Sequence, residues 1–193
     1  MKRIISLSLV MMLCASLLFA ATSCAAKHPI EEFKDKMAAE KNYQMTITLT
    51  NIPLFGTMTV TTKVDGNITY TPAVMFNEEE YTETVDGVEY KYTKNDDGKW
   101  TKTKVEVDED SSEIADDESM QQLFNPENYE KVKDEKNTYK QKKDVTFDNF
   151  EDVVMTIDED SCTIEMTATE GGYGAKIVIS KIGEIDLTLP TVE

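Results

Sequence analysis

Few residues of this chain are suited to chemistry. The sequence has one histidine, His28, and three cysteines, Cys14, Cys24 and Cys162. A general base must lie within hydrogen-bond reach of its substrate or nucleophile, and His28 stands in a short stretch near the amino terminus that cannot readily join a buried site. Cys162 alternates with threonines, so we expect a small packed side chain there and not a nucleophile, which would need a histidine partner.

The usual catalytic and metal-binding motifs do not occur in the sequence. It contains no G-x-S-x-G, no H-E-x-x-H and no glycine-rich phosphate loop. The acidic run 108–118 could suggest calcium, but it lacks the spaced acids and central glycine of an EF-hand loop, so we expect a solvated loop. The sequence therefore predicts a protein that is not an enzyme, with no catalytic residue, no metal site and no cofactor.

The amino terminus has the order of an export signal. Lys2 and Arg3 precede an apolar stretch over 4–21, and small residues then lead to Cys24. By themselves these features leave open an ordinary signal-peptidase cut or a membrane-spanning anchor. The segment Ala21-Thr22-Ser23-Cys24 resembles the bacterial lipobox, in which the cysteine is acylated before cleavage.

This resemblance implies a lipoprotein signal peptide over 1–23, a lipidated tether over 24–28 and an anchored domain on the extracytoplasmic side of the cell membrane. More than one acyl chain is needed for stable anchoring, and the diacyl or triacyl cysteine of such lipoproteins provides them. Cys162 would then be the sole remaining thiol, so no intramolecular disulfide could form. The net charge of −17 argues against a nucleic-acid partner, because phosphates would be repelled.

Beyond the tether, the pattern predicts one helix followed by many strands. Pro29 opens a helix over 29–40 with Ile30, Phe33 and Met37 on one stripe. From Tyr43 the apolar residues recur every second position, and Asp/Gly turns at 65–67, 86–87 and 95–98 separate short strands. Strands joined by such short turns must be antiparallel neighbours, which predicts a meander.

The second half of the chain is less regular. Met120, Leu123 and Phe124 indicate a short helix that ends near Pro126. Residues 129–143 suit a polar hairpin or a helix, and we favour a hairpin whose lysines protect a sheet edge. Alternation returns in strands near 153–157, 162–168, 175–179 and 185–189. Eleven or twelve strands and two helices in one domain over 29–193 are expected.

This order of elements resembles the LolA- and LppX-like lipoproteins. The likeness is carried by K-N-Y-Q-M-T-I-T, D-G-V-E-Y-K-Y-T, D-G-K-W and K-I-G-E-I-D-L-T-L-P. It implies a mainly β fold, a strongly curved antiparallel sheet or unclosed barrel, with the N-terminal and mid-chain helices covering the concave face. Several members of that superfamily bind acyl chains or lipopeptides there, and others have no known ligand.

Two functions therefore remain open. In the first, an acyl chain or other hydrophobic ligand lies in a half-barrel cavity. The alternative is a non-catalytic surface scaffold or interaction lipoprotein, whose core is filled and holds no small ligand. Methionines could line a cavity or fill an irregular core, and the tyrosines and Trp100 could frame its mouth or simply stand in strands. The candidate cavity residues are Phe33, Met37, Met45, Ile47, Met58, Val60, Tyr90, Leu123, Phe124, Met155, Ile164 and Met166.

Overall fold

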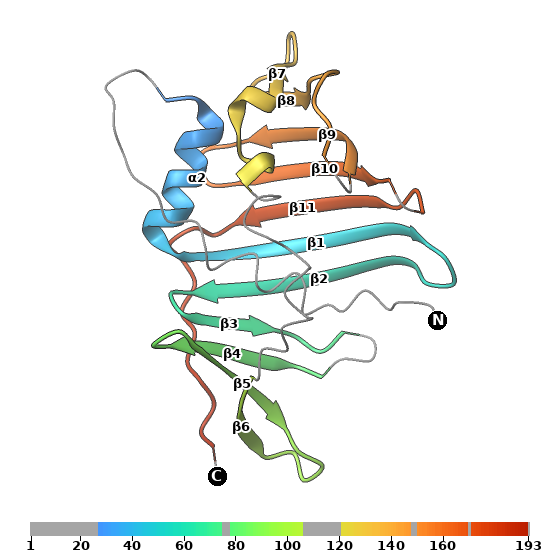
Figure 1. Cartoon of the computed structure of the whole chain (residues 1–193). Coiled ribbons are helices and arrows are strands. Elements are labelled where there is room, and N and C mark those ends of the chain that lie inside the picture. Colours follow the sequence, from blue (N-terminus) through green and yellow to red (C-terminus); the bar gives the residue numbers. More distant parts are fainter. Residues whose placement is uncertain (1–26, 75–77, 106–120, 148–149, 170, 193) are drawn as a thin grey trace.

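The strands of the described residues all belong to one antiparallel sheet. The computed structural model describes residues 27–74, 78–105, 121–147, 150–169 and 171–192. Within them the sheet has eleven strands in the order β6-β5-β4-β3-β2-β1-β11-β10-β9-β8-β7 (Figure 1). The strands are β1 (Asn42–Ile52), β2 (Gly56–Asp65), β3 (Ile68–Thr71), β4 (Glu80–Val85), β5 (Val88–Lys94), β6 (Trp100–Lys104), β7 (Tyr129–Lys131), β8 (Thr138–Gln141), β9 (Phe150–Ile157), β10 (Cys162–Ala168) and β11 (Gly174–Ser180).

Strand β1 joins two meanders at the centre of the sheet. Consecutive strands pair from β1 to β6 and again from β7 to β11, through the short turns that the sequence predicts. The second meander starts at the far edge and returns, so β11 pairs with β1 over Gln44–Thr50. Because β6 and β7 are edges and do not pair with each other, the sheet is an unclosed one, as predicted.

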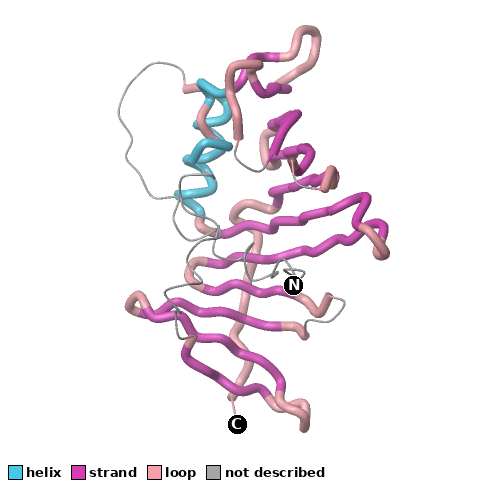
Figure 2. The backbone as a smooth tube through the Cα atoms, turned by 45° about the vertical axis from the view of Figure 1, so that its right-hand side comes forward, coloured by secondary structure: helices cyan, strands magenta, loops and turns pink. Residues whose placement is uncertain are grey.

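One helix, α2 (Pro29–Glu40), packs across the β1 and β9–β11 side of the sheet (Figures 1 and 2). Its bounds are those predicted from the sequence. His28 caps its start, since the Ile30 amide donates a hydrogen bond to His28 Nδ1 at 3.3 Å. Lys41 ends it with a left-handed backbone, φ 50°, and its amide donates to the Met37 carbonyl at 2.9 Å. We call the face that α2 covers the inner face, and the opposite one the outer face.

The mid-chain prediction is met where the structure describes it. Residues 121–123 are helical, and a 3-10 turn, η3 (Pro126–Asn128), follows a cap in which Asn125 accepts from the Glu127 amide. Residues 129–143 form the β7–β8 hairpin that we favoured over a helix. Met120, the acidic run 108–118, the signal over 1–23 and Cys24 lie outside the described residues. In the part that is described, no helix is long and apolar enough to cross a membrane.

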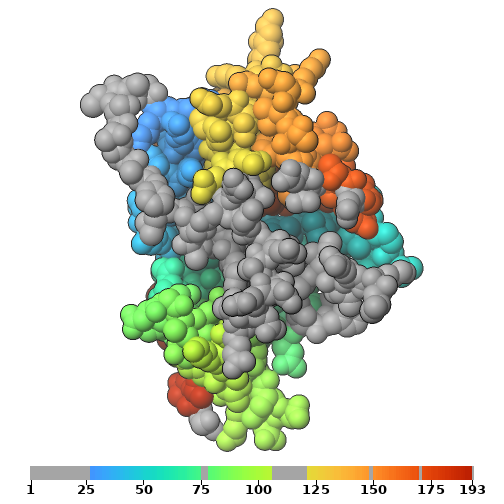
Figure 3. Space-filling view, viewed as in Figure 1, coloured from blue at the N-terminus to red at the C-terminus, as the bar shows by residue number. Residues whose placement is uncertain are grey.

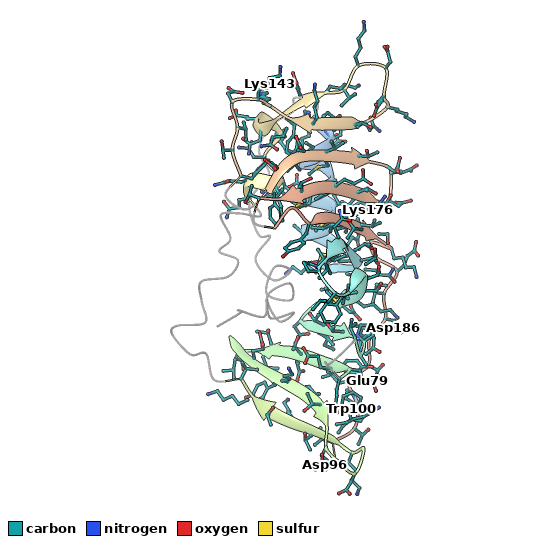
Figure 4. All side chains as sticks on the ribbon, turned by 90° about the vertical axis from the view of Figure 1, so that its right-hand side faces the viewer. Glu79, Asp96, Trp100, Lys143, Lys176 and Asp186 are labelled. Carbon is teal, nitrogen blue, oxygen red and sulfur yellow. The ribbon has the colours of Figure 1, made fainter. Side chains whose placement is uncertain are left out.

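The last predicted strand, 185–189, is not part of the sheet. This segment is extended but makes no ladder pairing, and two polar side chains of the outer face hold it instead. Asn42 bonds both backbone groups of Ile185, accepting from its amide at 2.7 Å, and Asp65 accepts from the Leu187 amide at 3.0 Å. The C-terminal segment therefore crosses the outer face, on the side where Figure 4 labels Asp186.

Candidate ligand-binding face

The register of the central strands brings the apolar positions of many strands onto the inner face. Met45 lies between Thr62 of β2 and Ile179 of β11, and Ile47 lies between Val60 and Ile177. Directly paired residues lie on the same face of a sheet, so the inner-face residues of each strand follow from those of its neighbour. Through β11 the inner face also includes Cys162, Ile164 and Met166 of β10, and then Met155 and Ile157 of β9.

Beneath α2 the inner face is a packed core. Met155 is 0% exposed and Ile164 and Phe124 are 1% exposed, while the rings of Phe33 and Phe124 stack with centroids 6.5 Å apart. Eight of the twelve candidate cavity residues belong to this one contact cluster: Phe33, Met37, Met45, Leu123, Phe124, Met155, Ile164 and Met166. These eight residues are thus buried together with other core side chains of the described structure.

Three other candidates lie toward the β1–β2 turn. Ile47 is half-buried at the border of the core cluster, Met58 is half-buried on β2, and Val60 is buried between them. The strand pairing adds three residues to this group. Leu49 lies opposite both Met58 and Ala175, and Ile177 lies opposite Ile47. We call this set the apolar strip; it comprises Ile47, Leu49, Met58, Val60, Ala175 and Ile177. Leu49, Ala175 and Ile177 could have been found from the same two-residue period as Ile47.

Tyr90 does not join these residues. It pairs with Glu83, Glu83 with Ile68, Ile68 with Asp65, and Asp65 with Asn42, all of which are outer-face positions. A direct role for Tyr90 on the inner face is therefore excluded by the register. Tyr43, in contrast, is a core residue, 3% exposed on the inner face.

The other aromatic side chains of β3–β6 also lie on the outer face. Tyr70 contacts Tyr81 with centroids 4.7 Å apart, and Tyr81 meets Trp100 edge-on at 5.5 Å. Lys94 lies 5.0 Å over the Trp100 ring, and Lys102 lies 4.2 Å over Tyr90. Cations thus already cover two of these ring faces, so this surface does not frame the mouth of a cavity on the opposite side.

Charged side chains of this outer surface are paired with one another. Glu83 accepts hydrogen bonds from the Tyr92 hydroxyl at 2.7 Å and from Lys102 at 3.0 Å. These two donors stabilise the carboxylate and lower the pKa of Glu83 below its ordinary value. Such pairs suit a solvent-facing sheet surface, where an ion pair adds little to stability.

On the inner face, polarity rises from the apolar strip toward β5. Beyond the strip, the inner face carries Val64 of β2 and then Thr69 of β3. Next on this face is an ion pair between Glu80 of β4 and Lys91 of β5. Glu89, on the same face of β5, has its pKa raised by burial and by Glu80. The inner face therefore offers an apolar region and a polar region side by side.

Cys162 and His28, the two residues considered for chemistry from the sequence, both have defined places in the fold. Burial raises the pKa of the Cys162 thiol to about 12, which keeps it protonated and unreactive at neutral pH. His28 caps α2 and its ring contacts Tyr139, with centroids 4.8 Å apart. In the described ranges no three histidine, cysteine or acidic side chains are grouped so that they could hold a metal ion.

Comparison of the sequence with known proteins does not identify a family for this chain. No protein-family model matches the chain, and no curated protein matches its sequence.

Proposed function

We propose that this protein is a membrane-anchored extracytoplasmic lipoprotein that binds an acyl chain or similar hydrophobic ligand along the apolar strip of its open sheet. The proposal moves the ligand from the α2-covered core to the neighbouring strands β1, β2 and β11. It involves no covalent step, and the anchor would be the lipid on Cys24.

The observation that carries the proposal is the partial exposure of apolar side chains on an inner face. Ile47, Leu49, Met58 and Ile177 are each half-buried, whereas the equivalent positions under α2 are fully buried. Removing apolar surface from water stabilises a complex by about 25 cal/mol per Å². A ligand lying along the strip would therefore gain affinity from side chains that the described helix leaves partly exposed.

The gradient of polarity indicates the kind of ligand. An acyl chain has a long apolar part and a polar end, and the inner face changes from the strip to the Glu80–Lys91 pair across β3 and β4. Met58 is unbranched and can adapt to chains of different shape, so modest selectivity among acyl ligands is expected.

Uptake of a fluorescent fatty acid by the full chain tests the proposal. Met58→Lys places a charge in the strip at a half-buried position, and we expect it to weaken uptake at least about tenfold, the effect of losing one buried apolar side chain. Val85→Lys is the matched control, because Val85 is an exposed strand residue, 38% accessible, at the end of β4. Equal uptake by the wild type and a folded Met58→Lys would remove the strip as the site.

The packed core favours a second candidate, a scaffold or interaction lipoprotein without a small ligand. Eight candidate cavity residues already contact one another, so binding within the core would require α2 to move. Native mass spectrometry of protein extracted from its own membrane separates the two functions. A copurifying lipid supports the carrier, and a ligand-free protein that also takes up no fatty acid supports the scaffold.

A further inference from the structure

The turn between β1 and β2 carries the most exposed apolar side chains among the described residues. Leu54 is 98% exposed and Phe55 is 49% exposed, while Val192 and Val85 follow at 43% and 38%. The hairpin projects past the ends of the neighbouring strands in Figure 1, and its teal tip reaches the right-hand margin of the molecule in Figure 3. We call Ile52–Phe55 the apolar tip.

The backbone makes leucine an unfavourable residue at this position. Leu54 has φ 74°, in the left-handed region that glycine or asparagine adopts at lower cost. The turn is nevertheless closed, because the Phe55 amide donates to the Ile52 carbonyl at 3.1 Å. Leu54 thus gives the fold neither burial nor an easy turn conformation. Strain combined with full apolar exposure is typical of a residue kept for an interaction.

The charge pattern distinguishes this hairpin from the other described strands. The protein is 30% charged with a net charge of −17, yet no charged residue occurs between Lys41 and Lys63. Acidic surfaces are repelled by anionic lipid headgroups, and burying any charge in the bilayer is costly. Residues 42–62, which form β1, the turn and most of β2, bear neither obstacle.

We propose that the apolar tip inserts Leu54 and Phe55 into the interfacial region of the membrane to which the protein is tethered. A bilayer accepts apolar side chains without a complementary shape. A specific protein interface needs about 800 Å² from each partner, which two side chains at a turn do not provide. The proposal rests on the membrane anchor of the proposed function but does not require ligand binding.

Insertion would give the domain a second attachment point. The tip and α2 adjoin opposite ends of β1, and eleven strand residues span about 36 Å. A lipid on Cys24, upstream of α2, would attach the α2 side of the domain to the membrane, and the apolar tip would attach the opposite side. Contact at both points restricts how the sheet can rotate about its lipid anchor.

Quenching by brominated lipid tests the insertion, with the native tryptophan as an internal control. The full chain is reconstituted into phosphatidylcholine vesicles with brominated or unbrominated acyl chains, and its intact mass is recorded first. The fluorescence of the wild type comes from its single tryptophan, Trp100, in β6 at one edge of the sheet. Phe55→Trp adds a second tryptophan at a half-exposed position of the apolar tip. We expect brominated lipid to quench the added emission and to leave the Trp100 emission unchanged.

Leu54→Asn in the Phe55→Trp protein sharpens the test, because asparagine tolerates the left-handed backbone. Loss of the leucine should lower the ratio of inserted to free tip at least about tenfold, the factor expected for one buried leucine, whereas Val85→Asn should not change it. Absence of quenching at position 55, or equal quenching of both tryptophans, overturns the proposal. If the intact mass lacks the acyl groups, the lipid anchor is contradicted and not the insertion of the tip. Failure of the anchor and failure of the insertion are therefore distinguishable.

Discussion

Alkaline pH should destabilise the protein through a buried thiol. Cys162 is 0% exposed, and burial, with a smaller contribution from Asp158, raises the pKa of its thiol from 9.0 to about 12. Burial also raises the pKa of Tyr129, whose hydroxyl donates to the Leu123 carbonyl at 2.8 Å. In the unfolded chain both groups ionise at their ordinary values. Their stabilising effect is therefore complete below about pH 9 and declines as the pH rises toward the native pKa values.

The size of the loss follows from proton linkage. Between pH 8.5 and 10.5, ionisation of Cys162 in the unfolded chain should lower the free energy of unfolding by about 1.9 kcal/mol. Tyr129, with an ordinary pKa of 10.0, should add about 0.8 kcal/mol over the same interval. The two groups together predict a loss of about 2.7 kcal/mol.

Urea denaturation at the two pH values measures this loss, and Cys162→Ala isolates the thiol. Groups other than Cys162 titrate in both proteins, so their contributions cancel in the comparison. We expect the wild type to lose about 2 kcal/mol more than Cys162→Ala between pH 8.5 and 10.5. Equal losses in the two proteins would refute the reasoning, since the thiol would then ionise as readily in the native state as in the unfolded chain.

Three further outcomes are expected. Met155→Ala, at a fully buried position of the core, should cost about 2–5 kcal/mol in urea denaturation, and Met58→Ala, at a half-buried one, should cost clearly less. Asn42→Ala removes both bonds to Ile185, so limited proteolysis should cleave the C-terminal segment faster than in the wild type; unchanged cleavage would mean that other contacts hold it. Cys24→Ser should abolish both acyl mass and membrane retention, and a variant still carrying acyl mass would contradict lipidation at Cys24.

Local sequence determined the secondary structure of most of the described chain. Pro29, the apolar stripe of Ile30, Phe33 and Met37, and the change of period at Tyr43 specify α2 and β1 through interactions within a few residues. The Asp/Gly turns likewise specify antiparallel neighbours, because a two-residue turn cannot connect parallel strands. An open sheet with an N-terminal helix could therefore be predicted.

The roles of individual candidate residues depended on distant parts of the chain. Alternation shows that Tyr90 and Tyr92 share one face of β5, but which face that is depends on the register of every pairing from β1 to β5. Residues 185–189 alternate like a strand, yet Asn42 and Asp65, more than a hundred residues earlier, hold them on the outer face.

The division between core and candidate ligand-binding face was likewise a tertiary result. Met155 and Met58 stand in similar alternating segments, and no local pattern distinguishes them. Met155 lies under α2 and is fully buried, whereas Met58 lies near the β1–β2 turn and remains half-buried. Packing of α2, and of Leu123, Phe124 and Phe147, into the core around Met155 creates this difference. Burial depends on which surfaces meet in space and not on the residues that flank each methionine.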